Sequence, residues 1–299
     1  MERKEFYHMY SNGDDAKNFI VCEEDFRFEF NLIAVCAFCS GVTVLGFSLE
    51  DTHVHSLLYG TRAQVYAFKS QFERSSIRHI SVTRGSRDGV VLDCSIDLIT
   101  DEEHLISVAA YVIIQPTKDG KPVQYYDYKW GSGPLYFRKQ PYATVWLLDE
   151  HSRTVEPVRY GDLKSYEKAA ISGRMALPDE WLVASGLVLP QNYVDVRMYE
   201  SIFLTHNRFR VFAGAGKKMI ESVQTAMAGS RGVMMDDLEA RGLCRQMAKR
   251  YYGSYDVRRL DLEKRLRLAA DLMRMYHMTF RQLATLTHLP ESEIRKYLG

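Results

Sequence analysis

The chain has 299 residues, of which 46% are hydrophobic and 26% are charged, and this composition excludes intrinsic disorder as a description of the whole chain. No apolar run approaches the roughly 18 residues that a membrane span needs, and the start of the chain lacks the apolar segment of a secretory signal, so the sequence predicts a cytoplasmic protein without a membrane partner. The net charge of +1 hides an uneven distribution, because residues 1–150 contain 15 basic and 21 acidic residues whereas residues 241–299 contain 13 basic and 6 acidic residues.

The first 135 residues alternate strand and helix patterns. In chain order, the pattern predicts a strand over 6–10, a helix over 23–38, strands over 42–49 and 53–59, a helix over 61–74, strands over 77–82 and 90–96, and a helix from about residue 101. Thr100 is the expected cap of the last helix, and Pro116 is expected to end it. This order favours the α+β class, with a ferredoxin-like antiparallel sheet covered by helices on one face.

The rest of the chain divides into two predicted regions. Residues 136–230 mix short apolar segments with prolines, and we interpret them as a connecting and packing region that becomes helical from about residue 195. Residues 231–299 are predicted to form a helical module. Its expected helices cover residues 260–276, 280–287 and 291–298.

The last two of these helices have the pattern of a helix-turn-helix. The expected buried positions are Ala284, Leu289, Ile294 and Leu298. His288 stands at a turn position that often needs a positive φ. The basic surplus of the region favours contacts of Arg281, Arg295 and Lys296 with DNA. A purely structural three-helix cap is the alternative, because two glutamates in the first turn of the last helix would repel phosphates.

Two short patterns contain residues suited to catalysis. His53 and His55 are two positions apart in a predicted strand, so both imidazoles leave the same face and can bind one divalent metal ion. Tyr111 and Gln115 are four positions apart in a predicted helix, so a phenol and an amide lie one turn apart on one face. Alone, the first pattern also fits two unrelated surface or packing histidines, and the second also fits an amphipathic helix whose aromatic residue packs in the core.

The order of the motifs adds information that no single motif carries. The motifs are Phe6-Tyr7-His8, His53-Val54-His55-Ser56-Leu57-Leu58, Tyr111-Val112-Ile113-Ile114-Gln115-Pro116 with Gly120, and Asp127-Tyr128-Lys129-Trp130-Gly131-Ser132. Over about residues 4–135, this order resembles the single-tyrosine HUH transposases of bacterial insertion sequences. It is most similar to their domesticated relatives, the REP-associated tyrosine transposases.

The resemblance implies a metal-dependent enzyme that nicks single-stranded DNA and transfers strands, acting on hairpins or REP-type repeats. His53 and His55 would bind Mg²⁺ or Mn²⁺, with Gln115 as the third protein ligand. Tyr111 would attack a phosphodiester and form a 5′-phosphotyrosine, leaving a free 3′-hydroxyl.

Several alternatives stay open at this point. Lys69 and Arg78 match positions where the family tends to be basic, and they are expected either to clamp phosphates or to be solvated surface charges. The protein as a whole could be a non-catalytic DNA-binding protein that retains the transposase fold, or a metal-dependent phosphoesterase acting on small substrates. The sequence is also compatible with both a monomer and a homodimer that shares active sites.

Overall fold

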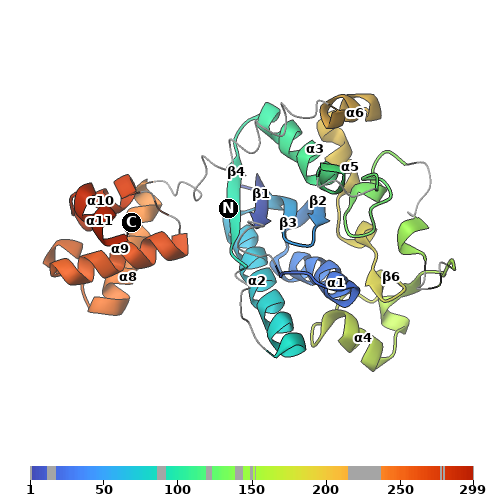
Figure 1. The fold of residues 1–299 in the computed structure, drawn as a ribbon, viewed down its shortest axis with the longest axis horizontal. Coiled ribbons are helices and arrows are strands. Elements are labelled where there is room, and N and C mark those ends of the chain that lie inside the picture. Colours follow the sequence, from blue (N-terminus) through green and yellow to red (C-terminus); the bar gives the residue numbers. More distant parts are fainter. Residues whose placement is uncertain are drawn as a thin grey trace. The chain divides into compact units, whose positions relative to one another are not determined.

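The fold is shown in Figure 1, a computed structural model. It describes residues 2–11, 18–85, 92–118, 123–138, 144–148, 151, 153–214, 237–276, 278 and 280–298. The chain divides into two compact units, residues 1–223 and 224–299. The boundary predicted at residue 231 lies outside the described residues.

An antiparallel sheet of four strands organises the first unit. Its strands are β1 (Glu5–Ser11), β2 (Thr43–Leu49), β3 (Val54–Gly60) and β4 (Cys94–Ile99). They pair in the order β2-β3-β1-β4, with α1 (Glu23–Ser40) connecting β1 to β2 and α2 (Arg62–Arg84) connecting β3 to β4. The predicted α+β class and antiparallel sheet are therefore confirmed.

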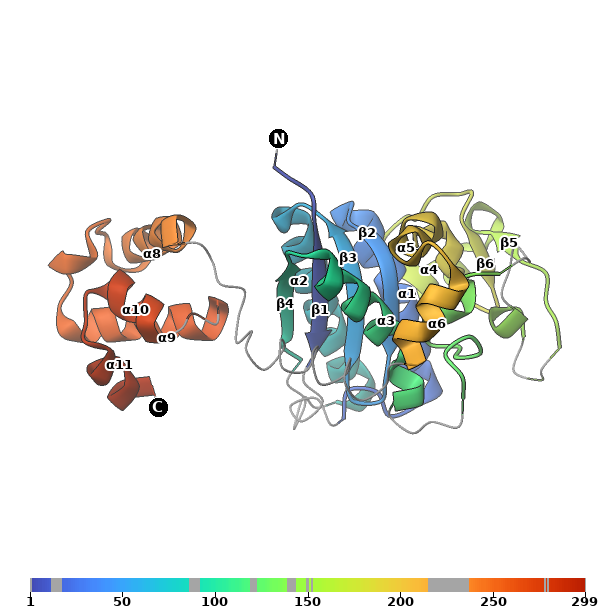
Figure 2. The ribbon, with the colours of Figure 1, turned by 90° about the horizontal axis from the view of Figure 1, so that it is seen from above.

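Helices cover both faces of this sheet, so the prediction that they cover one face is wrong. Phe30 of α1 packs against Phe47 of β2 with a distance of 5.5 Å between ring centroids, and α1 and α2 contact each other to form one layer. On the opposite face lies α3 (Glu102–Lys118), which follows β4 and crosses the sheet (Figure 2). The α3 face is the one that carries the histidines discussed below.

Helix α3 differs from its prediction at both ends. The Asp101 carboxylate accepts a hydrogen bond of 2.8 Å from the backbone N–H of His104, so Asp101 takes the capping role predicted for Thr100. The helix also continues through Pro116 to Lys118. A proline so close to the helix end disturbs few intrahelical hydrogen bonds, which explains why it does not stop the helix.

Helix α2 occupies the segment that was predicted as a strand over 77–82. A capping box between Thr61 and Gln64 begins the helix. The buried residues of this helix recur every three or four positions, at Val65, Phe68, Phe72, Ser76 and Ile80. Burial of this stripe outweighs the slightly lower helix propensity of the β-branched residues. The strand predicted over 90–96 corresponds to β4, which begins later, at Cys94.

The segment predicted to pack against the first domain wraps around the β2 edge of the sheet. It contains the 3₁₀ helices η1 (Gly133–Leu135), η2 (Thr144–Trp146), η3 (Tyr160–Asp162) and η4 (Pro190–Asn192), the strands β5 (Val158–Arg159), β6 (Leu182–Ala184) and β7 (Leu187–Val188), and the helices α4 (Ser165–Ser172), α5 (Val196–Phe203) and α6 (His206–Gly214). The small sheet β5-β6-β7 and α4 adjoin α1, whereas α5 and α6 pack against α3. The Asn31 side chain of α1 anchors the first group, donating to Gly186 O at 2.9 Å and accepting from Val188 N at 2.8 Å.

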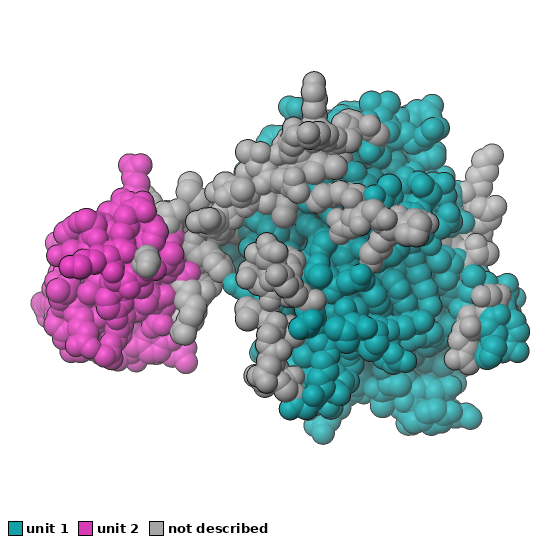
Figure 3. Space-filling view, viewed as in Figure 1, with its two compact units in different colours: residues 1–223 teal, residues 224–299 magenta. Residues whose placement is uncertain are grey.

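The second unit has a hydrophobic core of its own, and Figure 3 colours it separately. Its elements are α8 (Asp237–Tyr252), η5 (Val257–Arg259), α9 (Leu262–Tyr276), α10 (Phe280–Thr287) and α11 (Glu291–Leu298). The three predicted helices are present with nearly the predicted bounds. Leu289 and Ile294 are buried, Ala284 and Leu298 pack against this core, and His288 has the expected positive φ, at 54°.

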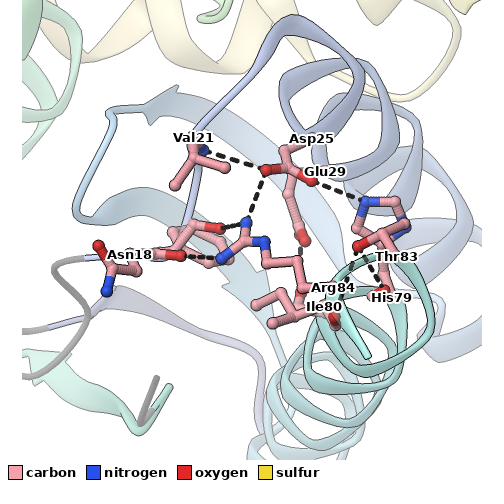
Figure 4. A network of polar contacts seen from close by, with 10 residues as sticks. Asn18, Val21, Asp25, Glu29, His79, Ile80, Thr83 and Arg84 are labelled. Atoms are coloured by element: carbon pink, nitrogen blue, oxygen red, sulfur yellow. Dashed lines mark hydrogen bonds and ion pairs between the residues drawn. The ribbon is translucent and has the colours of Figure 1, made fainter. Parts of the chain in front are cut away.

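Within the first unit, a buried polar network joins α1 to α2 (Figure 4). The Asp25 carboxylate accepts a hydrogen bond of 2.6 Å from Arg84 Nη2 and lies 3.0 Å from His79 Nε2. Burial would raise the pKa of Asp25, but the hydrogen bonds that it accepts lower the pKa below its usual value. Glu29, which accepts a hydrogen bond of 2.7 Å from Ser76 Oγ, has a pKa raised to about 8 by burial.

None of the helices in the described part of the chain is both long and apolar enough to cross a membrane.

Candidate functional site

Three aromatic side chains meet on the sheet face below α3. His55 of β3 is paired with Tyr10 of β1, and His8 lies two residues before Tyr10, so all three side chains leave the same face. His8 Nε2 lies 3.0 Å from His55 Nδ1, and the Tyr10 and His55 rings stack with centroids 6.1 Å apart. The cluster is nearly inaccessible, with His55 only 2% exposed.

Tyr111 reaches the same cluster from α3. Its ring lies edge-on to both histidines, with centroid distances of 5.3 Å to His55 and 6.2 Å to His8. The structure therefore brings the tyrosine and one predicted metal ligand together within a single chain. Tyr111 is itself only 2% exposed.

His53 is placed immediately before β3, next to His55. The two rings are 5.1 Å apart between centroids, as expected for residues that share a strand face. Thr52 Oγ1 lies 3.0 Å from His53 Nδ1. Both predicted histidines thus have Nδ1 in contact with a neighbouring side chain, Thr52 for His53 and His8 for His55.

Gln115 lies one turn beyond Tyr111 on α3. Helix α3 starts after Ile99, which pairs with Phe6 at one end of the sheet. At Tyr111 the helix has reached His55, near the other end of the sheet. The following turn of α3 carries Gln115. Gln115 is fully buried, and neither its amide oxygen nor its amide nitrogen has a hydrogen-bond partner among the described residues.

An unpaired buried amide is unfavourable, because leaving a donor or acceptor unsatisfied costs about 1–3 kcal/mol. Such groups are uncommon in folded proteins, and a bound ion or a catalytic role is among the explanations for one. The chemistry of Gln115 therefore fits the amide ligand expected from the sequence.

Burial also sets the protonation of the groups around His55. Desolvation, and to a lesser degree the nearby charge of His104, lowers the pKa of His8 to about 3. His8 is consequently neutral near pH 7 and can accept a hydrogen bond from His55 Nδ1–H. Burial, with a hydrogen bond to Asp97 and the negative charge of that residue, raises the pKa of Tyr10 above its ordinary value.

A buried carboxylate beside the histidine pair was missed by the sequence analysis. Glu50 is 1% exposed, its backbone N–H donates to His53 O at 2.8 Å, and its carboxylate accepts a hydrogen bond of 2.9 Å from Ser48 Oγ. The alternation of Ser48 and Glu50 just before the short turn into β3 is the signal that could have identified it.

The last sequence motif holds this turn in place. Tyr128 donates its hydroxyl to Leu49 O at 2.6 Å, and Gly131 forms a bridge with Ser48. A Cβ atom on Gly131 would lie only 3.2 Å from Phe47 O, so a small residue suits this close approach. The motif therefore supports the site without contributing a reactive group.

The structure does not bring Lys69 and Arg78 to the histidine cluster. Both belong to α2, in the helical layer on the opposite face of the sheet (Figure 2). Lys69 Nζ lies 3.2 Å from Glu73 Oε1 and 3.3 Å from Asp93 Oδ1, so its charge is compensated within the protein. Arg78 is exposed.

The three predicted DNA contacts in the second unit are all exposed, but they differ in their surroundings. Arg295 donates from Nε and Nη2 to Glu291 Oε1, at 2.9 and 2.7 Å, and its guanidinium carbon lies 4.5 Å from the centre of the Phe280 ring. Among the described residues, Arg281 and Lys296 form no ion pair. Arg295 is therefore the least available of the three for a phosphate.

No group of three or more His, Cys, Asp or Glu side chains is arranged to hold a metal ion in the part of the chain that the structure describes. The ligand set expected from the sequence is of another kind, because it combines two imidazoles with an amide. Comparison with known proteins finds no matching family model, no similar curated protein and no matching solved structure.

Proposed function

We propose that the protein cuts and rejoins single-stranded DNA through a 5′-phosphotyrosine on Tyr111, acting on hairpin or REP-type repeats. The observation that carries the proposal is the unpaired, buried amide of Gln115, one turn from a tyrosine whose ring lies beside His55. The β-α-β-β-α-β connectivity and the strand order β2-β3-β1-β4 agree with the ferredoxin-like fold that such an enzyme would need.

His53, His55 and Gln115 would hold Mg²⁺ or Mn²⁺. When bound, the ion would neutralise charge on the phosphate under attack. Because Nδ1 of each histidine already contacts a side chain, Nε2 is the atom that would face the ion. His8 would act as a positioning residue, since its neutral ring would accept the Nδ1 proton of His55 and fix the orientation of that imidazole.

In the reaction, the phenol oxygen of Tyr111 attacks phosphorus while the bond from phosphorus to the 3′ oxygen breaks. The phenol loses its proton, and the leaving 3′ oxygen gains one. Attack of a 3′-hydroxyl on the phosphotyrosine reverses these changes and joins the strands. The energy of the phosphodiester is conserved in the protein-DNA bond, so no external energy source is needed.

The burial of Tyr111 sets a condition for this chemistry. A phosphodiester contacts a side chain that is 2% exposed only after a segment next to it moves. Catalysis therefore requires an open form in which α3 or a neighbouring segment is displaced from the histidine face.

The test is to incubate the full chain with end-labelled hairpin DNA from the host genome and Mn²⁺ or Mg²⁺. A covalent adduct should appear on a denaturing gel, and Tyr111→Phe should reduce its yield by at least about 100-fold, because the nucleophile is lost. The exposed Tyr126 provides the matched control, and Tyr126→Phe should leave the yield unchanged. An adduct that persists in Tyr111→Phe, or the absence of an adduct with every hairpin, would refute the proposal.

The burial of Tyr111 and His55 favours a second candidate, a non-catalytic DNA-binding protein with the same fold. It predicts salt-dependent DNA binding without cleavage. Changing His53, His55 and Tyr111 would then leave DNA affinity unaltered.

A further inference from the structure

The second unit contains a pocket lined by residues that are distant in sequence. Its volume is about 600 Å³, and it lies between α8, η5 and the end of α10. Its floor includes the core residues Cys244, Val257 and Leu286. Its rim is formed by polar and charged residues, namely Arg241, Arg245, Tyr255, Asp256, Arg258, Thr285 and His288.

Three arginines converge on this pocket from two elements. Arg241 and Arg245 are one turn apart on α8, so they project from the same side of the helix. Both are exposed, and neither forms an ion pair with any residue that the structure describes. Arg258 of η5 donates from Nε to His288 Nε2 at 3.4 Å.

The remaining charges around the pocket leave it positive. Asp256 is the acidic residue on the rim, and its carboxylate accepts from the backbone N–H of Arg258 and lies 3.6 Å from Arg259 Nε. Partial burial, followed by the charges of Arg258, Arg265 and Arg241, lowers the pKa of His288. The pocket thus disfavours another positive charge and is suited to an anion.

Exposed tyrosines accompany these arginines. Tyr255, on the rim, is 61% exposed, and Lys249 Nζ lies 5.3 Å from the centre of its ring. Tyr251 on α8 is 49% exposed, with the Arg250 guanidinium carbon 5.9 Å from its ring centre. Cations beside accessible aromatic rings are the usual composition of surfaces that bind single strands, where bases stack and phosphates are neutralised.

We propose that this pocket binds a backbone phosphate of single-stranded DNA between Arg241, Arg245 and Arg258, while an adjacent base stacks on Tyr255. That the ligand of the pocket is DNA rests on the proposed function. The inference does not require Tyr111 to be a nucleophile. It moves the main DNA contact of the second unit from the α10–α11 side, where Arg295 is engaged by Glu291, to the α8–η5 side.

The experiment measures binding of the full chain to a short fluorescein-labelled single strand by fluorescence anisotropy, in EDTA so that no cleavage occurs. The double variant Arg241→Gln/Arg245→Gln should bind at least about 10-fold more weakly. Its plot of log affinity against log salt should be shallower by about 1.4, because each phosphate contact to a single strand contributes roughly 0.7 to that slope. Tyr255→Leu should weaken binding by roughly 10-fold without changing the slope.

The matched control is Arg281→Gln/Lys296→Gln, which removes the same charge from exposed positions of α10 and α11. It should change affinity by less than about 2-fold if the pocket is the phosphate site. Unaltered binding of the pocket variant together with loss of binding in the control would overturn the inference. Equal affinity for a duplex of the same sequence would overturn the stacking contact of Tyr255. Circular dichroism melts of each variant confirm that the fold is retained.

The two proposals fail separately. Loss of binding in the pocket variant without any DNA adduct in the wild-type protein refutes the Tyr111 chemistry and supports the pocket. An adduct in the wild-type protein together with full binding by the pocket variant supports the Tyr111 chemistry and refutes the pocket.

Discussion

His8 lies beside His55, one of the proposed metal ligands, and would contribute no ligand itself. It is buried, its pKa is lowered to about 3, and its ring nitrogen lies 3.0 Å from His55 Nδ1. As the acceptor in this contact, His8 would favour the His55 tautomer that presents Nε2 to the proposed ion. The first sequence motif, Phe6-Tyr7-His8, would thereby have a physical role in the proposed site.

We predict that His8→Ala weakens Mn²⁺ binding by about 10- to 100-fold, because His55 loses the partner that orients it. Electron paramagnetic resonance of free Mn²⁺ measures the affinity. His8→Gln, which retains an amide oxygen as acceptor, should recover part of the loss. His79→Gln, in the α1–α2 layer, should have no effect. Full Mn²⁺ affinity in His8→Ala would exclude the positioning role.

At the level of elements, the α1–α2 pair contains a buried acid whose protonation is linked to stability. The pKa of Glu29 is raised from 4.5 to about 8 in the folded protein, so folding favours the protonated carboxyl. Its contribution to the free energy of unfolding is fully present below pH 4.5, decreases as the pH rises, and is lost above about pH 8.

Glu29→Gln should therefore be more stable than the wild type above pH 8, by about 1–3 kcal/mol, and similar to it near pH 5. The glutamine carries no charge and keeps an oxygen that accepts from Ser76 Oγ. Urea unfolding at both pH values provides the measurement. Glu24→Gln, at an exposed position on the same helix, serves as control and should shift neither curve. A Glu29→Gln protein with the wild-type pH dependence would contradict the raised pKa.

At the level of the whole molecule, each compact unit has its own core. The buried cluster of the second unit is formed by residues from Ala240 to Ile294, and Leu283 is 0% exposed within it. Removing atoms there creates a cavity that this unit has to accommodate.

We expect Leu283→Ala to destabilise residues 224–299 by about 2–5 kcal/mol and to leave unfolding of residues 1–223 unchanged. Hydrogen exchange followed by mass spectrometry resolves the two units, with faster exchange expected only in α8 to α11. Thr285→Ala, at an exposed position of the same helix, is the control and should leave exchange nearly unchanged. Equal acceleration in β1 to β4 would show that the units unfold together.

Local sequence patterns were sufficient for most of the secondary structure. The alternation around His53 and His55, the acidic start of α3 and the periodicity of α9 to α11 are each determined by neighbours within a few residues. The shared face of His53 and His55 was also predictable from local sequence, since it follows from strand geometry alone. The segment over 77–82 was mispredicted because β-branched residues favour strands locally, while burial of Ile80 against the core favours a helix.

The site itself was decided by tertiary structure. Pairing of β1 between β3 and β4 brings His8 beside His55, and packing of α3 on that face brings Tyr111 to both. Tertiary contacts also bury Tyr111 and Gln115 and pair Lys69 with Glu73 and Asp93. They likewise form the arginine pocket of the second unit. Sequence alone determined which groups are present and which face of each element carries them. Their distances, partners and exposure depend on contacts between residues far apart in the chain, which only the assembled fold specifies.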